Sequence, residues 1–397
     1  MHKILPSLIL SMLLPLTTFA QPSQLFLYDA DTLLQLKDNQ NEQPEPALGL
    51  LIKRANAALK NPIRSVTQKQ RLPASGNPND YFSIGPYWWP NPDSEDGLPF
   101  IRKDGERNYA TLEQIPDSQL LRDFVQDVSN LAVAYHLTGD RRYGETAIKH
   151  LQAWFIHPAT RMNPNFEHAQ AVPGVASGRG FGIIEGRFLI HIPDTVQLLG
   201  DALSENDRDR IIQWFSDLNQ WMLTSENGKA ENDWHNNHGT WFDAQVVAYA
   251  LFTGDLETAR TQLKVTQERR ITQHFDADGK QPAEFERTRP WHYANFNLEA
   301  YNLLGQFGRQ LGVDIWGYSR GNISLHRGYS LIANYLLEPE SWPFKELYGM
   351  DIKAAHATMY YAQNAYGDKI FSQALEKILS ESSDSIVNTD PRLWPIQ

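Results

Sequence analysis

Apolar residues recur at helical spacing along most of the chain. Runs of alternating Val, Ile and Thr, which indicate half-buried strands, are scarce. We therefore predict an all-α protein. The predicted helical stretches are residues 119–157, 183–224, 240–274, 292–312, 322–337 and 351–380.

One helical unit repeats along the chain. Residues 131–140 recur loosely as 246–255, and a weaker echo follows at 360–368. Each copy ends in a Gly-Asp pair, in which the glycine stops one helix and the aspartate opens the next. Helical hairpins that repeat around a ring form a toroid. We therefore predict an incomplete (α/α) toroid of helical hairpins with long active-site loops.

Two long loops interrupt the helices, at residues 77–108 and 160–179. Loops of this length in a compact protein are usually functional. The chain has no Ser/Gly-rich linker between helical stretches, so we interpret residues 21–397 as a single toroid domain.

The N-terminus matches a secretory signal. Residues 1–3 include a lysine, residues 4–16 are mostly apolar, and Ala20 ends a small-residue cleavage site. We predict that residues 1–20 are removed and that the protein is periplasmic or secreted, without a membrane span. The chain has no cysteine, so neither a disulfide framework nor a thiolate metal site is available.

The charge balance limits the partners. The formal net charge is −11, which disfavours nucleic-acid binding. A polyanionic sugar is equally disfavoured by the overall field, so such a substrate requires a local basic cleft. The candidate residues for this cleft are Arg179, Arg187, Arg287 and Arg289.

Two segments carry the candidate chemistry. Residues 236–241 supply an amide and an imidazole, and residues 286–293 supply a guanidinium and a phenol. A glycoside hydrolase needs two opposed carboxylates and a metalloprotease needs an HExxH motif. The observed set instead suits removal of a proton beside a carboxylate. We expect no metal and no cofactor.

The predicted mechanism is β-elimination on a 1,4-linked polyuronate. Asn237, His238 and Arg287 neutralise the sugar carboxylate, so that the carbanion at C5 is stabilised as it forms. Tyr293 takes the C5 proton as phenolate and protonates the leaving O4. A phenol has a pKa of about 10, so this role requires a shift of roughly 3 units, for which Arg287 and His238 are the predicted sources.

Further residues are predicted to contact the substrate. The aromatic loop at 87–89 suits sugar faces, and a helix starting near 238 places Trp241 on the face of His238. Each feature also has a structural interpretation: a hydrophobic plug, a helix cap at 236–238, or a buried core tyrosine at 293. The predicted substrate contacts are Tyr87, Trp88, Trp89, Gln170, Arg179, Trp241 and Arg289.

Four motifs in this order resemble the alginate lyase family. They are residues 81–92, the glycine-rich segment 178–184, the Asn-Asn-His-x-x-Trp of 236–241, and the Glu-Phe-x-Arg-Thr segment that leads to Tyr293. The resemblance covers about residues 45–375 and implies a metal-independent lyase on an α/α toroid. It places Asn237 and His238 as the neutralising pair, Arg287 as the arginine and Tyr293 as the acid and base.

The chain departs from the family pattern in one place. In the best-known mannuronate lyases the spacing from arginine to tyrosine is one residue longer, and a histidine follows the tyrosine where Ala294 stands here. Glucuronan is therefore a second candidate polymer beside alginate. An inverting hydrolase that uses Glu185 and Glu284, and a non-catalytic carbohydrate-binding protein, are the competing hypotheses. We expect a monomer, and the choice between Arg287 and Arg289 stays open.

Overall fold

The computed structural model describes residues 25–39, 46–386 and 390–396. The predicted signal segment lies outside these residues. Within the described part of the chain, no helix is long and apolar enough to cross a membrane.

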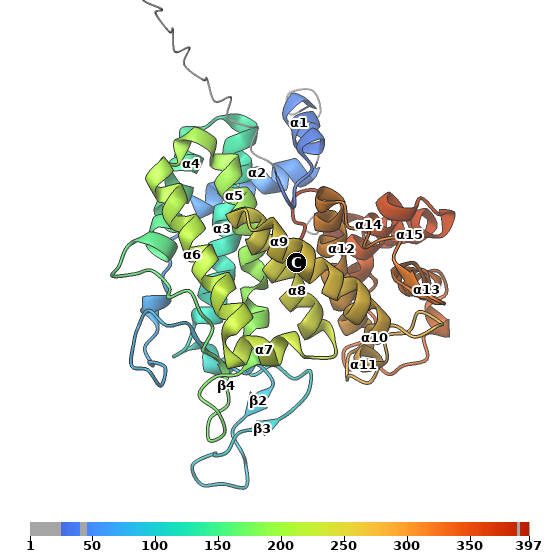
Figure 1. Ribbon diagram of the computed structural model, residues 1–397, viewed down its shortest axis with the longest axis horizontal. Helices are drawn as coiled ribbons and strands as arrows, with labels where there is room; N and C mark the ends of the chain where they lie inside the picture. The colour runs from blue at the N-terminus through green and yellow to red at the C-terminus, as the bar shows by residue number, and fades with distance from the viewer. Residues whose placement is uncertain (1–24, 40–45, 387–389, 397) are drawn as a thin grey trace, which may run out of the picture.

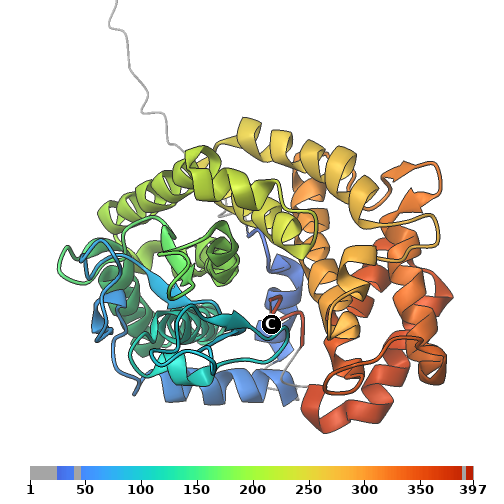
Figure 2. The same cartoon turned by 90° about the horizontal axis from the view of Figure 1, so that it is seen from below.

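The described helices form an α/α toroid, as predicted, and Figure 2 shows them around a common centre. Helices α3, α5, α8, α12 and α14 follow one another around the ring through mutual contacts, and α4, α9 and α15 pair with α3, α8 and α14 as hairpins. Almost every residue of α8 is buried, which places this helix in the interior. The bounds are α3 Asp117–Thr138, α4 Arg141–Leu151, α5 Ile192–Leu199, α6 Glu205–Thr224, α8 Asn237–Thr253, α9 Leu256–Val265, α12 Pro290–Leu311, α13 Leu325–Leu337, α14 His356–Tyr366 and α15 Lys369–Ile386.

The helix ends confirm the repeat. Gly139, Gly254 and Gly367 end α3, α8 and α14 in the left-handed conformation, with φ of 70°, 78° and 72°. An L side chain rarely adopts this conformation, so glycine is the suitable residue. The aspartates after the first two glycines cap α4 and α9 through bonds from backbone N–H groups. The sequence did not predict that α4 and α9 continue as π-helical turns, at Gln152–Ile156 and Thr266–Ile271.

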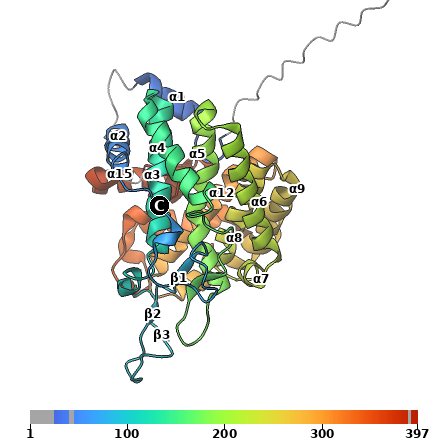
Figure 3. The same ribbon diagram turned by 90° about the vertical axis from the view of Figure 1, so that its left-hand side faces the viewer.

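Short strands join the two long loops at one end of the helical body (Figures 1 and 3). Strand β1, Phe82–Ile84, pairs in parallel with β4, His168–Ala171. Strand β2, Trp88–Trp89, pairs antiparallel with β3, Ile101–Arg102, and makes a hairpin whose tip extends away from the helices. The loops are therefore attached to each other as well as to the toroid.

The start of the described chain is attached to helix α5 of the ring. Asp194 of α5 accepts hydrogen bonds from the backbone N–H groups of Phe26, Leu27 and Tyr28, which attaches the start of the described chain to the ring. The other helices and strands are α1 Ala30–Asn39, α2 Pro46–Ala58, α7 Glu226–Asn232, α10 Thr272–His274, α11 Pro282–Phe285, β5 Ser319–Arg320 and β6 Ile323–Ser324.

Candidate active site

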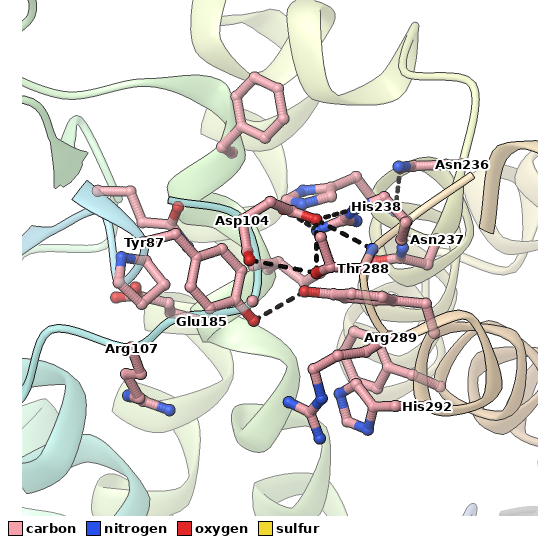
Figure 4. A pocket seen from close by; sticks show the side chains of 18 of the residues that line it. Tyr87, Asp104, Arg107, Glu185, Asn236, Asn237, His238, Thr288, Arg289 and His292 are labelled. Carbon is pink, nitrogen blue, oxygen red and sulfur yellow. Dashed lines mark hydrogen bonds and ion pairs between the residues drawn. The ribbon is translucent and has the colours of Figure 1, made fainter. Parts of the chain in front are cut away.

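A pocket of about 1140 Å³ opens at the loop end of the toroid. One side is formed by the loop that carries β2 and β3, and the other by the N-terminal ends of α8 and α12 (Figure 4). The predicted site residues that line it are Tyr87, Trp88, Gln170, Arg179, Asn237, His238, Arg287, Arg289 and Tyr293. Residues from four separate parts of the sequence thus converge on one cavity.

Two predicted substrate contacts do not line this pocket. Trp241 has no exposed surface, and its indole N–H donates to the Phe296 carbonyl oxygen at 3.1 Å. The prediction that Trp241 contacts the substrate is therefore wrong, because the helix turns this ring into the core below the pocket. Trp89 lies on the hairpin, where its indole N–H donates to the Glu106 carbonyl oxygen and Lys103 lies over its ring.

The imidazole of His238 is held from behind by a buried carboxylate. Glu231 of α7 is 1% exposed, and its Oε1 lies 2.6 Å from His238 Nδ1. A carboxylate in this position accepts from a protonated Nδ1, so Nε2 remains for the pocket. Asn236 caps α8 by accepting the His238 backbone N–H at 3.1 Å. The capping interpretation is thus correct for Asn236, while His238 faces the pocket.

A second buried carboxyl group lies behind Asn237. Glu284 Oε1 accepts the Asn237 backbone N–H at 2.6 Å, and the Asn237 side-chain nitrogen lies 3.0 and 2.9 Å from the two Glu284 oxygens. Burial raises the pKa of Glu284 to about 7, although the hydrogen bonds from Asn237 and the charge of Arg287 act in the opposite direction. Asn237 is only 1% exposed, so at least one of its amide N–H groups is directed at Glu284 and away from the open pocket.

The guanidinium of Arg287 is paired with Asp104 from the opposite loop. Arg287 Nε and Nη2 donate to the two Asp104 carboxylate oxygens at 3.2 and 2.8 Å. Thr288 adds a hydroxyl bond to the same carboxylate at 3.1 Å. Burial acts to raise the pKa of Asp104, but the hydrogen bond and charge of Arg287 outweigh it and lower this pKa. The loop is therefore attached to the opposite side of the pocket through Arg287.

The hydroxyl of Tyr293 donates to the hydroxyl of Tyr87 at 2.8 Å. The Arg287 guanidinium lies 3.7 Å from the centre of the Tyr293 ring. Burial, together with the neighbouring Tyr87, raises the pKa of Tyr293 above its ordinary value, and Arg287 offsets this only in part. The prediction that nearby cations bring this phenol near neutrality is therefore wrong, because burial outweighs the charge of Arg287, which is paired with Asp104.

The glycine-rich segment presents Arg179 through close packing. A Cβ at Gly178 would lie 1.9 Å from the Glu167 carbonyl oxygen, and a Cβ at Gly182 would lie 2.2 Å from the Ala169 side chain. These glycines are needed because the segment packs directly on β4. Arg179 Nε donates to the Gln170 carbonyl oxygen at 2.8 Å. Gln170 has φ of 46°, a strained conformation for a residue with a side chain, and such strain is typical of functional sites.

The pocket is locally basic, as the sequence predicted. Seven arginines line it against four carboxylates, a formal excess of three positive charges in a chain of net charge −11. Burial lowers the pKa values of Arg179 and Arg187 to about 10, so both remain cationic at neutral pH. The four arginines proposed for a basic cleft all lie here: Arg179, Arg187, Arg287 and Arg289.

The two carboxyl groups considered for a hydrolase do not face each other across this cavity. Glu185 lines the pocket, but its Oε2 accepts from the hydroxyls of Tyr81 and Ser83, both at 2.7 Å. Glu284 is 1% exposed and does not line the pocket. An inverting hydrolase requires an acid and a base on opposite faces of the sugar. Glu185 and Glu284 therefore do not supply hydrolase chemistry.

Sequence reasoning missed Glu231 and Asp104. Glu231 stands seven residues before His238, but the turn between α7 and α8 had to be known before the pairing was visible. Asp104 lies 183 residues before Arg287, and no periodicity links them. In the described residues, no group of three or more His, Cys, Asp or Glu side chains is arranged to hold a metal ion.

A phenol, an imidazole and a guanidinium meet in a cavity whose charge attracts polyanions, on a toroid of helical hairpins. This combination places the protein among the polysaccharide lyases. A family model described as alginate lyase matches residues 65–342. The chain belongs to the alginate lyase family.

Solved structures show the same relationship. The chain is similar to an alginate lyase from Bacteroides ovatus, with 31% identity, a TM-score of 0.84, and coverage of 90% of this chain and 98% of that one. It shares the fold of alginate lyase A1-III from Sphingomonas species A1, with 15% identity, a TM-score of 0.53, and coverage of 85% and 88%. A search of curated proteins found no match.

Proposed function

We propose that this protein cleaves the 1,4-glycosidic bonds of alginate by β-elimination and leaves a 4,5-unsaturated sugar at the new non-reducing end. The observation that carries the proposal is the convergence of His238, Arg287 and Tyr293 on one basic pocket. The similarity to an alginate lyase with 31% identity over almost its whole length supports alginate as the substrate.

The first step is neutralisation of the sugar carboxylate. In this step His238 acts as an imidazolium, which donates Nδ1–H to Glu231 and Nε2–H to the sugar carboxylate. The free N–H groups of Arg287 donate to the same carboxylate, and the positions of both side chains are set before the substrate arrives. An amide nitrogen carries two N–H bonds, so Asn237 donates one to Glu284 and one to the substrate. With its charge neutralised, the carboxylate accepts the electron pair that forms at C5.

The second step is proton transfer. The Tyr293 hydroxyl passes its proton to Tyr87, whose own proton goes to water at the pocket mouth. The phenolate of Tyr293 then takes the C5 proton, the C5–H electron pair forms the C4–C5 double bond, and the C4–O4 bond breaks. Tyr293 returns the proton to O4, so the step is balanced without added water. Because burial raises the pKa of Tyr293, the phenol is neutral at pH 7, and the free enzyme must first lose a proton.

Glucuronan is the second candidate polymer. Ala294 is fully buried on α12, at the position where the mannuronate lyases that the sequence resembles carry a histidine. Position 294 thus lies behind the pocket, while His292 on the other side of Tyr293 in the sequence lines it, so glucuronan is kept as a candidate by the departure from the family pattern alone. We also propose that residues 1–20 direct export to the periplasm, where such a polymer is accessible.

The test is ultraviolet absorbance of the unsaturated product. Purified protein is incubated with poly-mannuronate, poly-guluronate and glucuronan, and we expect absorbance to rise on at least one of the two alginate polymers. New reducing ends without absorbance would indicate a hydrolase. Absorbance on glucuronan alone would replace alginate as the substrate. Folded protein that binds all three polymers but cleaves none would leave a carbohydrate-binding protein.

A further inference from the structure

The arginines of the pocket share one arrangement. Six of the seven have their guanidinium carbon within 5.5 Å of the centre of an aromatic ring that also lines the pocket. A uronate residue has an apolar ring face beside a carboxylate, so an aromatic ring next to a guanidinium matches both of its parts. The six pairs are Arg107–Tyr109, Arg122–Phe188, Arg179–Trp88, Arg187–Phe188, Arg287–Tyr293 and Arg289–Tyr348.

Two of these pairs have an aromatic ring that is mostly exposed. Tyr109 is 67% exposed and Tyr348 is 65% exposed, whereas Tyr293 is 5% exposed. In the part of the chain that the structure describes, no hydrogen bond is made by the hydroxyl of Tyr109 or Tyr348. Neither ring therefore serves the core or the catalytic hydrogen bonds. Both rings remain open to a ligand at the rim of the pocket.

The two exposed pairs come from opposite sides of the site. Tyr109 opens a short 3-10 turn, Tyr109–Leu112, directly after the loop that carries β2 and β3. Tyr348 lies in the loop before α14, whose neighbouring Leu347 N–H donates to the Thr288 carbonyl oxygen at 3.0 Å. Figure 4 shows Arg107 and Arg289 on either side of Tyr87, the partner of the catalytic phenol.

The size of the pocket agrees with a ligand longer than one sugar. Its volume of about 1140 Å³ exceeds the roughly 300–1,000 Å³ of sites that bind drug-sized molecules. Only one glycosidic bond is cleaved at Tyr293. The space and the pairs beyond that point are therefore available to sugars that do not react.

We propose that Arg107 with Tyr109, and Arg289 with Tyr348, form two outer subsites that each bind one uronate residue of the polymer, on opposite sides of the bond that is cleaved. The tyrosine ring receives the apolar face of the sugar and the arginine receives its carboxylate. This assignment rests on the proposed lyase function and adds that the enzyme recognises a chain rather than a single linkage.

The subsites make cleavage depend on chain length. A sugar bound at either rim contributes binding energy only if the oligomer is long enough to reach it. Polymer therefore gains from both pairs, while the shortest cleavable oligomer gains from neither. Aromatic contacts of this kind are worth about 0.5–1.5 kcal/mol, which corresponds to an effect of about two- to tenfold for each subsite.

The experiment compares Tyr109→Ala, Tyr348→Ala and the double variant with wild type, on long poly-mannuronate and on the shortest oligomer that wild type cleaves. We expect KM for the polymer to rise about two- to tenfold in each single variant and further in the double variant. We expect kcat on polymer, and all activity on the short oligomer, to stay at the wild-type level. Tyr109→Phe and Tyr348→Phe should behave as wild type, because they keep the ring.

Leu256→Ala is the matched control, since Leu256 is 41% exposed and lies outside the pocket. An unchanged KM for polymer in the double alanine variant would overturn the two subsites. Equal losses on polymer and short oligomer would overturn them as well, because the rings would then act on the site as a whole. If the proposed lyase function is wrong, wild type itself releases no unsaturated product, which separates this outcome from a failure of the subsites. Affinity electrophoresis in poly-mannuronate would then test the subsites by binding alone.

Discussion

The two sides of the pocket are stabilised in different ways. On the helical side, His238 and Asn237 are bonded to Glu231 and Glu284, which are buried and lie behind the site. On the loop side, Tyr87 and Asp104 are bonded across the pocket to Tyr293 and Arg287, the proposed catalytic residues. A substrate that enters leaves the first set of bonds in place but must compete with the second.

The helical side therefore positions the hydrogen-bond donors, while the loop side controls how easily the substrate reaches them. Donors fixed by buried partners need no reorganisation when charge develops on the sugar, which is the condition for electrostatic catalysis. The loop-side bonds instead use the same guanidinium and phenol that the proposed reaction needs. The carboxylate of Asp104 accepts hydrogen bonds from Arg287 in the way that a sugar carboxylate would. Substitutions on each side should therefore affect different kinetic constants.

Tyr293→Phe gives the largest expected effect. It removes the proposed base and acid but keeps the ring under Arg287. We expect kcat to fall about a thousandfold or more, with little change in KM, because acid–base groups contribute roughly 10²–10⁴ and this residue performs both transfers. The measurement is steady-state release of unsaturated product.

Tyr87→Phe separates proton release from transfer to the sugar, because it removes the hydroxyl that receives the Tyr293 proton and leaves the Tyr293 hydroxyl in place, so we expect a smaller fall in kcat. A loss in Tyr87→Phe as large as that in Tyr293→Phe would mean that the pair acts as a unit. A Tyr293→Phe variant that retains a tenth of wild-type kcat would remove Tyr293 from the proposed role.

The pH profile follows from the raised pKa of Tyr293. Because that pKa lies above its ordinary value, the phenol is neutral at pH 7 and its phenolate fraction grows as pH rises. We expect kcat/KM of the free enzyme to increase about tenfold for each pH unit through neutrality, and to decline near pH 10, where Arg179 and Arg187 lose their charge. A profile that is flat from about pH 6 to 8 would contradict a phenolate base.

Glu231→Gln tests the helical side. The amide keeps the size of the side chain but loses the charge that binds the Nδ1 of His238. A hydrogen bond to a charged group is worth about 1.5–3 kcal/mol, so we expect kcat to fall about ten- to a hundredfold. Glu231→Asp should recover part of this loss, and thermal unfolding should show whether the variants stay folded. Wild-type kcat in Glu231→Gln would mean that the carboxylate does not position the imidazole.

The sequence predicted the parts of this site that are local. Gly139 and Gly254 marked the repeat because a helix end needs a left-handed residue, and the adjacent positions of Asn237 and His238 placed both at one helix start. The prediction for Trp241 failed because helical spacing shows which residues share a face of the helix, but not whether that face points to the pocket or to the core.

The loop side was beyond such reasoning. The bond between Asp104 and Arg287 joins loop and helix 183 residues apart, and it depends on a hairpin tip whose path is set by β2 and β3. The raised pKa of Tyr293 was also unpredictable, because burial is a property of the assembled pocket and outweighs the nearby cation. Interactions across the ring therefore had to be read from the structure.

Asp104→Asn gives the smallest expected effect and tests the loop side directly. It removes one negative charge and releases the guanidinium of Arg287 for the substrate. Two unit charges at about 4 Å interact by about 1 kcal/mol in a water-like medium, so we expect KM for poly-mannuronate to fall about fivefold. The fall should shrink as salt is added, since screening weakens the attraction of the freed cation for the polymer. A rise in KM would show instead that Asp104 serves mainly to anchor the loop. The hydrogen bonds of the loop side would then position the site, as those of the helical side do, rather than compete with the substrate.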